Sequence, residues 1–176
     1  MSRTNPYKKK KRQANKTLLA FGEGMNEEIF LKHLRKLYCC NTNVAITVKK
    51  GRGGDAENIV LDASKVPGGF NRIVVVLDND KPKKEIQKAR AMAKEKEIEL
   101  IENTPCLEHL LLLILESKNI STESKKCKKV FEDEYIEKRL RRESYKYDKY
   151  FTKEMLEEKR KTIKMLNSVI NIMEGK

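Results

Sequence analysis

Two short apolar runs in this chain end in acidic residues. The run Leu18–Phe21 is followed by Gly22-Glu23-Gly24, and the run Ile73–Leu77 is followed by Asp78-Asn79-Asp80. The second run contains no polar residue, which is typical of a parallel strand that is buried on both faces. In open α/β sheets, ligands bind at the carboxyl ends of the strands. The sequence therefore predicts one acidic cleft at that edge of a sheet.

Strand-like and helix-like segments alternate from residue 17 to residue 117. Apolar runs predict strands at 17–21, 44–48, 72–77 and 98–101, and helical spacing predicts a helix after each of them. This alternation predicts an α/β fold with a parallel four-stranded sheet and right-handed crossovers. After residue 119 no strand pattern is present, and two charged helices are expected at about 124–142 and 153–174.

The same patterns divide the chain into three parts. Residues 1–16 are a basic arm that is expected to be disordered, because a block of like charges repels itself. Residues 17–118 form the α/β domain, and residues 119–176 form an all-helical C-terminal appendage. The basic arm is equally suited to contact nucleic acid or to keep the protein soluble.

The chain has a large excess of positive charge. It contains 39 lysines and arginines against 26 acidic residues, a net charge of +13. This excess favours a polyanionic partner, nucleic acid ahead of a membrane surface, although a lysine-rich proteome would give the same charge. The candidate phosphate contacts are Lys8, Lys9, Lys10, Lys11, Arg12, Lys49, Lys50, Arg52, Lys138, Arg139, Arg141 and Arg142.

Two tyrosines follow the basic residues at positions 138–142. Tyr145 and Tyr147 are candidates to stack on unpaired bases. The alternative for this stretch is an ordinary solvated helix face. Basic charge contacts phosphate alone, so the sequence does not separate DNA from RNA.

Several other classes of protein are disfavoured. No apolar run approaches the roughly 20 residues that cross a bilayer, and no signal peptide precedes the first strand. The four cysteines form no CxxC pair, so neither a zinc site nor a disulfide framework is predicted, and reduced thiols in a cytoplasm are expected. No Ser-His-Asp or Cys-His arrangement is present, and Gly51–Gly54 lacks the phosphate-loop pattern.

The acidic residues have the spacing of a divalent-metal site. Glu23 and Glu27 are four residues apart, so a helix that begins near Gly24 would bring them together. Asp78 and Asp80 are two apart and point the same way at a strand end. Carboxylate oxygens and water suit Mg²⁺ or Mn²⁺. Such ions could activate a water and stabilise the charge that develops on a phosphodiester.

Each acidic residue also has a simpler explanation. Glu27 could stabilise a helix N-terminus, and Asp78-Asn79-Asp80 could form a turn that caps the next helix. Glu108 is a further candidate ligand, because a carboxylate among leucines is costly to bury without a partner. The alternative to a ligand role is that Glu108 lies on the solvent side of the first turn of a helix.

The chain resembles the RloB family of small proteins with a Toprim-like fold. The resemblance rests on four motifs in the family's order, which are Glu23-Gly24-Met25-Asn26-Glu27 with Phe30, Gly53-Gly54, Leu77-Asp78-Asn79-Asp80, and Pro105-Cys106-Leu107-Glu108 with its leucine run. Two positions depart from the family pattern. Asn103-Thr104 stands where the family typically has Ser-Asn, and Leu110 stands where an aromatic is typical.

The resemblance implies a fold, a site and a function. It implies a parallel sheet with helices on both faces, and a metal-binding role for Glu23, Glu27, Asp78 and Asp80, with Glu108 as a suggested addition. Glu23 would serve as general base or metal ligand, and Asp78 and Asp80 would complete the catalytic set. The expected activity is cleavage of DNA or RNA in phage defence, beside an ATPase partner. The competing hypothesis is a non-catalytic module that binds nucleic acid or regulates the ATPase. The oligomeric state is not readable from the sequence.

Overall fold

The computed structural model describes residues 16–140 and 143–176. Its centre is a sheet of four parallel strands in the order β2-β1-β3-β4. The strands are β1 (Lys16–Gly22), β2 (Val44–Lys50), β3 (Arg72–Asp78) and β4 (Glu99–Asn103). The α/β class and the parallel four-stranded sheet are confirmed. The second strand is longer than the predicted 44–48, because Lys49 and Lys50 also belong to β2 and pair with β1.

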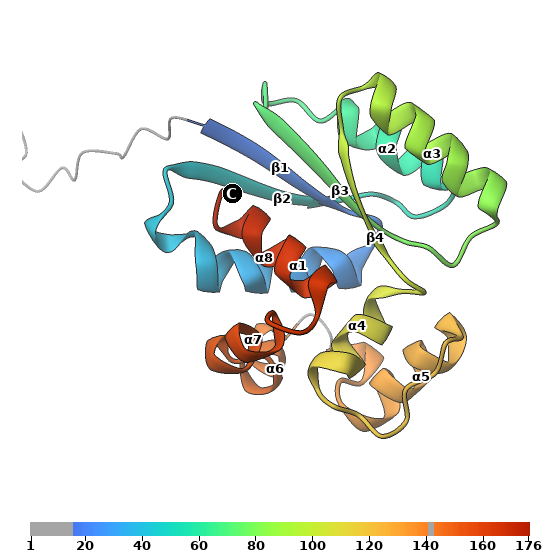
Figure 1. The fold of residues 1–176 in the computed structure, drawn as a ribbon, viewed down its shortest axis with the longest axis vertical. Helices are drawn as coiled ribbons and strands as arrows, with labels where there is room; N and C mark the ends of the chain where they lie inside the picture. The colour runs from blue at the N-terminus through green and yellow to red at the C-terminus, as the bar shows by residue number, and fades with distance from the viewer. Residues whose placement is uncertain (1–15, 141–142) are drawn as a thin grey trace, which may run out of the picture.

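Helices cover both faces of the sheet (Figure 1). Helices α1 (Met25–Tyr38) and α8 (Lys164–Met173) pack on one face, and α2 (Ala56–Ser64) and α3 (Lys83–Glu95) pack on the other. Alternate residues of β3 serve the two layers, since Val74 and Val76 join one apolar cluster while Val75 and Leu77 join the other. The apolar run is therefore buried on both faces, as its composition predicted.

The C-terminal region differs from its prediction in detail. Instead of two long helices it contains α5 (Ser124–Glu134), a short 3₁₀ helix at Lys138–Leu140, α6 (Ser144–Tyr150), α7 (Lys153–Lys159) and α8. A local signal starts α7, because the side chain of Thr152 accepts a hydrogen bond from the backbone N–H of Met155 and caps the helix. The short segments still contribute to one buried cluster, which includes Ile136, Tyr147, Phe151 and Leu156.

The apolar cluster on the α1 face joins both halves of the sequence. Leu166 and Ile170 of α8 belong to the same cluster as Leu18 of β1 and Val76 of β3. The chain division at residue 118 remains a prediction, and the helices beyond it contribute to the core of the sheet. Within the described ranges, no helix is long and apolar enough to cross a membrane.

The strand order creates a crevice at the carboxyl edge of the sheet. The chain leaves β1 through α1 toward β2, and it leaves β3 through α3 toward β4, in the opposite direction. Ligand sites in open α/β sheets lie where neighbouring strands diverge in this way. After β4 the chain enters α4 (Leu107–Ile114), and a 3₁₀ turn at Cys39–Asn41 links α1 to β2. The ends of β1 and β3 and the start of α4 therefore surround one crevice.

Candidate metal centre

Glu23 occupies the turn between β1 and α1. Its backbone N–H donates to the carbonyl oxygen of Val76 at 3.0 Å, which ties the turn to β3. Its side chain accepts a hydrogen bond from the backbone N–H of Asp78 at 3.1 Å and pairs with the Lys81 ammonium at 2.9 Å. Two contacts therefore hold the Glu23 carboxylate at the carboxyl edge, and a third holds its backbone there.

Glu27 lies in the first turn of α1 and points back toward the strand end. Its Oε2 accepts a hydrogen bond from the backbone N–H of Gly24 at 2.9 Å, so it also caps the helix. The side chain is buried against Gly22, where an added Cβ would lie only 2.5 Å from the Glu27 Cβ. Glycine at position 22 is therefore what lets the helix start so close to the end of β1.

Asp78 and Glu108 complete the buried acidic group. Asp78 ends β3, and its Oδ1 accepts a hydrogen bond from the backbone N–H of Leu107 at 2.9 Å. Glu108 lies in the first turn of α4 and is 1% exposed, so a place on the solvent side of that turn is wrong. Its Oε1 accepts a hydrogen bond from the Asn26 amide at 2.6 Å. Its Oε2 is buried and has no hydrogen-bond partner among the described residues.

The electrostatic state of these acids reflects their crowding. Burial is the largest cause that raises the pKa of Glu27 to about 7, and the charges of Glu108 and Glu23 add to it. Burial again leads in raising the pKa of Asp78 to about 8, followed by the charges of Glu27 and Glu108. The protein alone supplies too little positive charge to keep every one of these carboxylates ionised at neutral pH.

The predicted acids converge on one cleft, with one exception. A cavity of about 260 Å³ is lined by Glu23, Gly24, Met25, Asn26, Glu27, Gly53, Asp78, Glu108 and Lys128. Asp80 is not part of this lining. Its side chain is 27% exposed and lies at the rim, 3.4 Å from the Lys128 ammonium. The structure therefore brings Glu23, Glu27, Asp78 and Glu108 together and leaves Asp80 at the edge.

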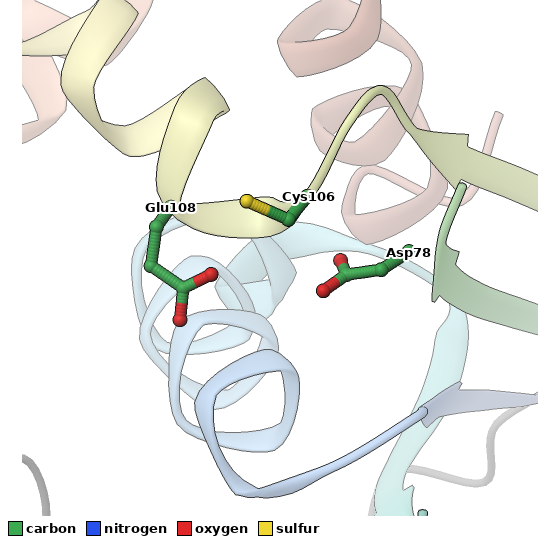
Figure 2. Close-up of side chains that lie close together, drawn as sticks. All are labelled: Asp78, Cys106 and Glu108. Carbon is green, nitrogen blue, oxygen red and sulfur yellow. The ribbon is translucent and has the colours of Figure 1, made fainter. Parts of the chain in front are cut away.

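A tighter group of possible ligand atoms lies within this cleft. One ligand atom each of Asp78, Cys106 and Glu108 fall within 4.8 Å of one another. Figure 2 shows Asp78 at the end of β3, facing Cys106 and Glu108 at the start of α4. Burial raises the pKa of the Cys106 thiol to about 12, so the thiol is protonated at neutral pH. The two carboxyl groups thus supply the oxygen donors of this group.

These residues fit a divalent cation. The Oε2 of Glu108, which has no hydrogen-bond partner among the described residues, offers a free lone pair. Burial and the neighbouring acids raise the pKa of Asp78, so a bound cation would favour its ionised form. Oxygen donors of this kind favour Mg²⁺ or Mn²⁺, whereas the neighbouring thiol would suit a softer ion once deprotonated. The cluster could therefore hold a metal ion, and its donor atoms do not by themselves fix which one.

The sequence did not indicate Lys128, a cation that lines the cleft. Lys128 of α5 places its ammonium 3.4 Å from both Asp78 Oδ2 and Asp80 Oδ2. Burial opposes its charge, but the carboxylates of Asp78, Glu108 and Asp80 prevail and raise the pKa of Lys128. It lies 50 residues beyond Asp78 in a lysine-rich helix, so no local pattern distinguished it from its neighbours.

A second missed residue is Asn103, at the end of β4. It pairs with Asp78 in the sheet and is 1% exposed. Neither its amide nitrogen nor its amide oxygen has a hydrogen-bond partner among the described residues. Its position was noted in the sequence only as a departure from a family motif.

The predicted phosphate contacts are dispersed. Lys50 lines a cavity beside α1, Arg52 lies 3.8 Å from Asp62, and Arg139 pairs with Glu137 at 2.7 Å. Lys49 is exposed at the end of β2. The remaining candidates lie outside the described residues or have undescribed side chains, namely Lys8, Lys9, Lys10, Lys11, Arg12, Lys138, Arg141 and Arg142.

The two tyrosines proposed for base stacking have different environments. Tyr145 is 56% exposed, so its ring is accessible to a base. Tyr147 is buried in the apolar cluster beneath α1, and its ring packs near Phe151. An open stacking surface made by both rings is therefore not present.

Comparison with known proteins identifies the family. A family model described as RloB-like protein matches residues 18–172. The chain belongs to the RloB-like family. The match includes the sheet, the acidic cleft and the C-terminal helices that contribute Lys128. No curated protein matches the chain, and no solved structure matches it.

Proposed function

We propose that this RloB-like protein is a metal-dependent nuclease that cleaves phosphodiester bonds in DNA or RNA, with Mg²⁺ or Mn²⁺ as cofactor. One observation carries the proposal. Buried carboxylates from three separate segments converge at the carboxyl edge of a parallel sheet in a protein of net charge +13. A negative cleft in a basic protein suits a cation that joins the carboxylates to a polyanionic substrate. The arrangement is also what a Toprim-like fold would require.

The cleft residues would divide the work. Asp78 and Glu108, with Glu23, Glu27 and Asp80 around them, would hold the ion, which supplies an activated water and stabilises negative charge on the phosphodiester. Glu23 is the residue best placed to act as general base or ligand, because Lys81 and the Asp78 N–H fix its carboxylate. Lys128 would offer a positive charge to a phosphate at the rim.

The proposal also covers the biological role of the nuclease and its partner protein. The RloB-like membership supports a role in phage defence, in the cytoplasm, with an ATPase as partner. Under that arrangement the ATPase would control when the nuclease acts. Co-purification of the chain with the product of a neighbouring ATPase gene tests this part separately from the chemistry.

A second candidate function is a non-catalytic module that binds nucleic acid or regulates an ATPase. The position of Lys128 favours it, because a lysine 3.4 Å from both Asp78 and Asp80 compensates part of the acidic charge without metal. In that case the cleft would be a structural ion-pair network.

A cleavage assay separates the two functions. The wild type, Asp78→Ala and Asp80→Ala are incubated with single-stranded and duplex DNA and RNA in Mn²⁺, and the products are sequenced at their ends. The nuclease proposal expects cleavage by the wild type, loss of at least about a hundredfold in rate for Asp78→Ala, and a smaller loss for Asp80→Ala at the rim. Equal inactivity of all three with retained binding would support the module.

A further inference from the structure

A second cavity lies beside the acidic cleft, on the other side of the first turn of α1. Its volume is about 390 Å³, within the range of small-ligand pockets. Its walls come from α1, the end of β2 and α6, and they consist of Met25, Glu28, Ile29, Lys32, His33, Lys36, Lys50, Tyr147 and Asp148. Met25 lines both this cavity and the acidic cleft, so the two are neighbours.

The interior of this cavity is apolar, and its rim carries three lysines and two carboxylates. Ile29 and Met25 contribute aliphatic surface, and the buried ring of His33 lies 6.1 Å from that of Tyr147 between centroids. His33 donates its Nε2–H to the carbonyl oxygen of Phe151 at 2.7 Å, and its Nδ1 lies 3.4 Å from the Asp148 carboxylate. Burial lowers the pKa of His33 and so favours its neutral ring. The interior is therefore suited to a flat, uncharged group.

The rim supplies the charge that would select the ligand. Lys32 pairs with Glu28 at 2.7 Å, and Lys36 pairs with Asp148 at 2.8 Å. Lys50 has no carboxylate partner among the described residues. Its register in β2 places it on the α1 side of the sheet, beside Gly22 at the end of β1. One lysine is thus left to contact an anion between the cavity and the cleft.

We infer that this cavity holds an unstacked nucleobase of the nucleic-acid strand, with the adjoining phosphate on Lys50 and the next phosphodiester at the acidic cleft. An apolar slot with a basic rim matches a nucleotide, which combines a flat base with an anionic linkage. The base must leave its stack to enter, so the substrate is single-stranded or locally unpaired. The inference rests on the proposed function, since it assigns the substrate class of that same cleft.

The test measures binding without metal, so cleavage plays no part in it. A 12-residue single-stranded oligonucleotide carrying one 2-aminopurine is titrated with the protein in EDTA, as DNA and as RNA, and its duplex is titrated in parallel. The chain contains no tryptophan, so the emission of the base analogue is read with little protein background. We expect the emission to rise on binding, and the single strand to bind at least about tenfold more tightly than the duplex.

Two variants test the two parts of the slot. Ile29→Ser removes apolar surface without changing charge, and it should weaken single-strand binding about fivefold, as the loss of a base contact does. Lys50→Gln should weaken it by a similar factor and reduce its salt dependence. The matched controls are Ile120→Ser and Lys88→Gln, which change exposed residues outside the cavity and should leave affinity within about twofold of wild type. Thermal melts check that every variant is folded.

The outcomes separate this inference from the nuclease proposal. Equal affinity for single strand and duplex, or an Ile29→Ser variant that binds like wild type, would overturn the base slot and leave cleavage untouched. A slot that behaves as expected in a protein that does not cleave with Mn²⁺ would overturn the nuclease proposal and leave the slot in place. A cavity that responds to an added peptide and not to either nucleic acid would also contradict the inference.

Discussion

The backbone N–H of Asp78 donates a hydrogen bond to Oε2 of Glu23 at 3.1 Å, and this contact links the ends of β1 and β3. The same Asp78 uses its side chain to bind the start of α4, through the backbone N–H of Leu107. One residue therefore joins three of the segments that carry carboxylates. The cleft is organised by the protein itself, so a cation would find its ligands already in place.

Removing the Asp78 carboxylate should weaken divalent-metal binding. Calorimetry with Mn²⁺ is expected to show an affinity at least about tenfold lower for Asp78→Ala, a loss that even residues supporting a metal ligand commonly cause. Glu95→Ala removes an exposed carboxylate on α3 and should bind Mn²⁺ like wild type. Equal affinity in all three proteins would place the metal elsewhere.

The crowded acids make the metal-free protein sensitive to pH. Folding raises the pKa of Asp78 from 3.8 to about 8, so the folded state prefers the protonated acid. Asp78 therefore contributes to the free energy of unfolding. This contribution is fully present below about pH 4 and is lost as the pH rises through about 8. In EDTA the melting temperature should fall across that window.

Asp78→Asn should remove much of this pH dependence, because the amide does not titrate and its oxygen can still accept the Leu107 N–H. At about pH 8 in EDTA the variant should melt about 3 °C or more above wild type, which corresponds to about 1 kcal/mol for a chain of this size. A melting temperature of wild type that rises between pH 5 and pH 8 would contradict the assigned burial of these acids.

The close approach of α1 to β1 depends on Gly22. Alanine there would place its Cβ 2.5 Å from the Glu27 Cβ, so helix and strand would have to separate. We expect Gly22→Ala to cost about 1–3 kcal/mol in the free energy of unfolding and to weaken Mn²⁺ binding. At Gly24 an added Cβ would meet only the flexible end of Glu27, at 3.3 Å, so Gly24→Ala should cost less. Chemical denaturation compares the two variants directly.

Lys128 should compete with a metal ion for the cleft. Lys128→Met removes a positive charge 3.4 Å from two carboxylates. That charge repels a divalent ion about twice as strongly as it repels a proton, so the substitution favours metal binding over protonation. Mn²⁺ affinity at about pH 7.5 should therefore rise, by about fivefold, while any cleavage should slow because the phosphate loses a contact. Lys126→Met, at an exposed site on the same helix, is the control. A weaker Mn²⁺ affinity in Lys128→Met would show that the lysine supports the site in another way.

The fold was predictable because its signals are local. The strand Arg72–Asp78 contains the continuous apolar run Ile73–Leu77, and helices with clear spacing follow each strand. Layers and connections therefore follow from general rules. The C-terminal helices were not predictable in the same way, because their arrangement depends on packing Phe151 against Phe30 of α1, which is a tertiary effect. The convergence of Glu23 and Asp78 was predictable from the strand-end rule.

Other parts of the cleft depend on contacts distant in sequence. Lys128 reaches Asp78 only because α5 folds back beside the start of α4, and nothing near residue 128 indicates that arrangement. The burial of Glu108 was open in the sequence, where the first turn of a helix can face solvent or core with equal ease. For Asp80 the sequence predicted too much. Its spacing from Asp78 suggested that both would be metal ligands in the cleft, and the structure places Asp80 at the rim.

The most direct test of the metal centre is anomalous X-ray scattering from crystals of the protein grown or soaked with Mn²⁺. A Mn²⁺ peak is predicted in the cleft, within coordination distance of carboxylate oxygens of Asp78 and Glu108 at about 2.2 Å, with the Lys128 ammonium displaced from Asp78. Crystals of Asp78→Ala grown in the same way should lack that peak. Full occupancy of Mn²⁺ at other sites with none in the cleft, at a pH where the acids are ionised, would contradict the account.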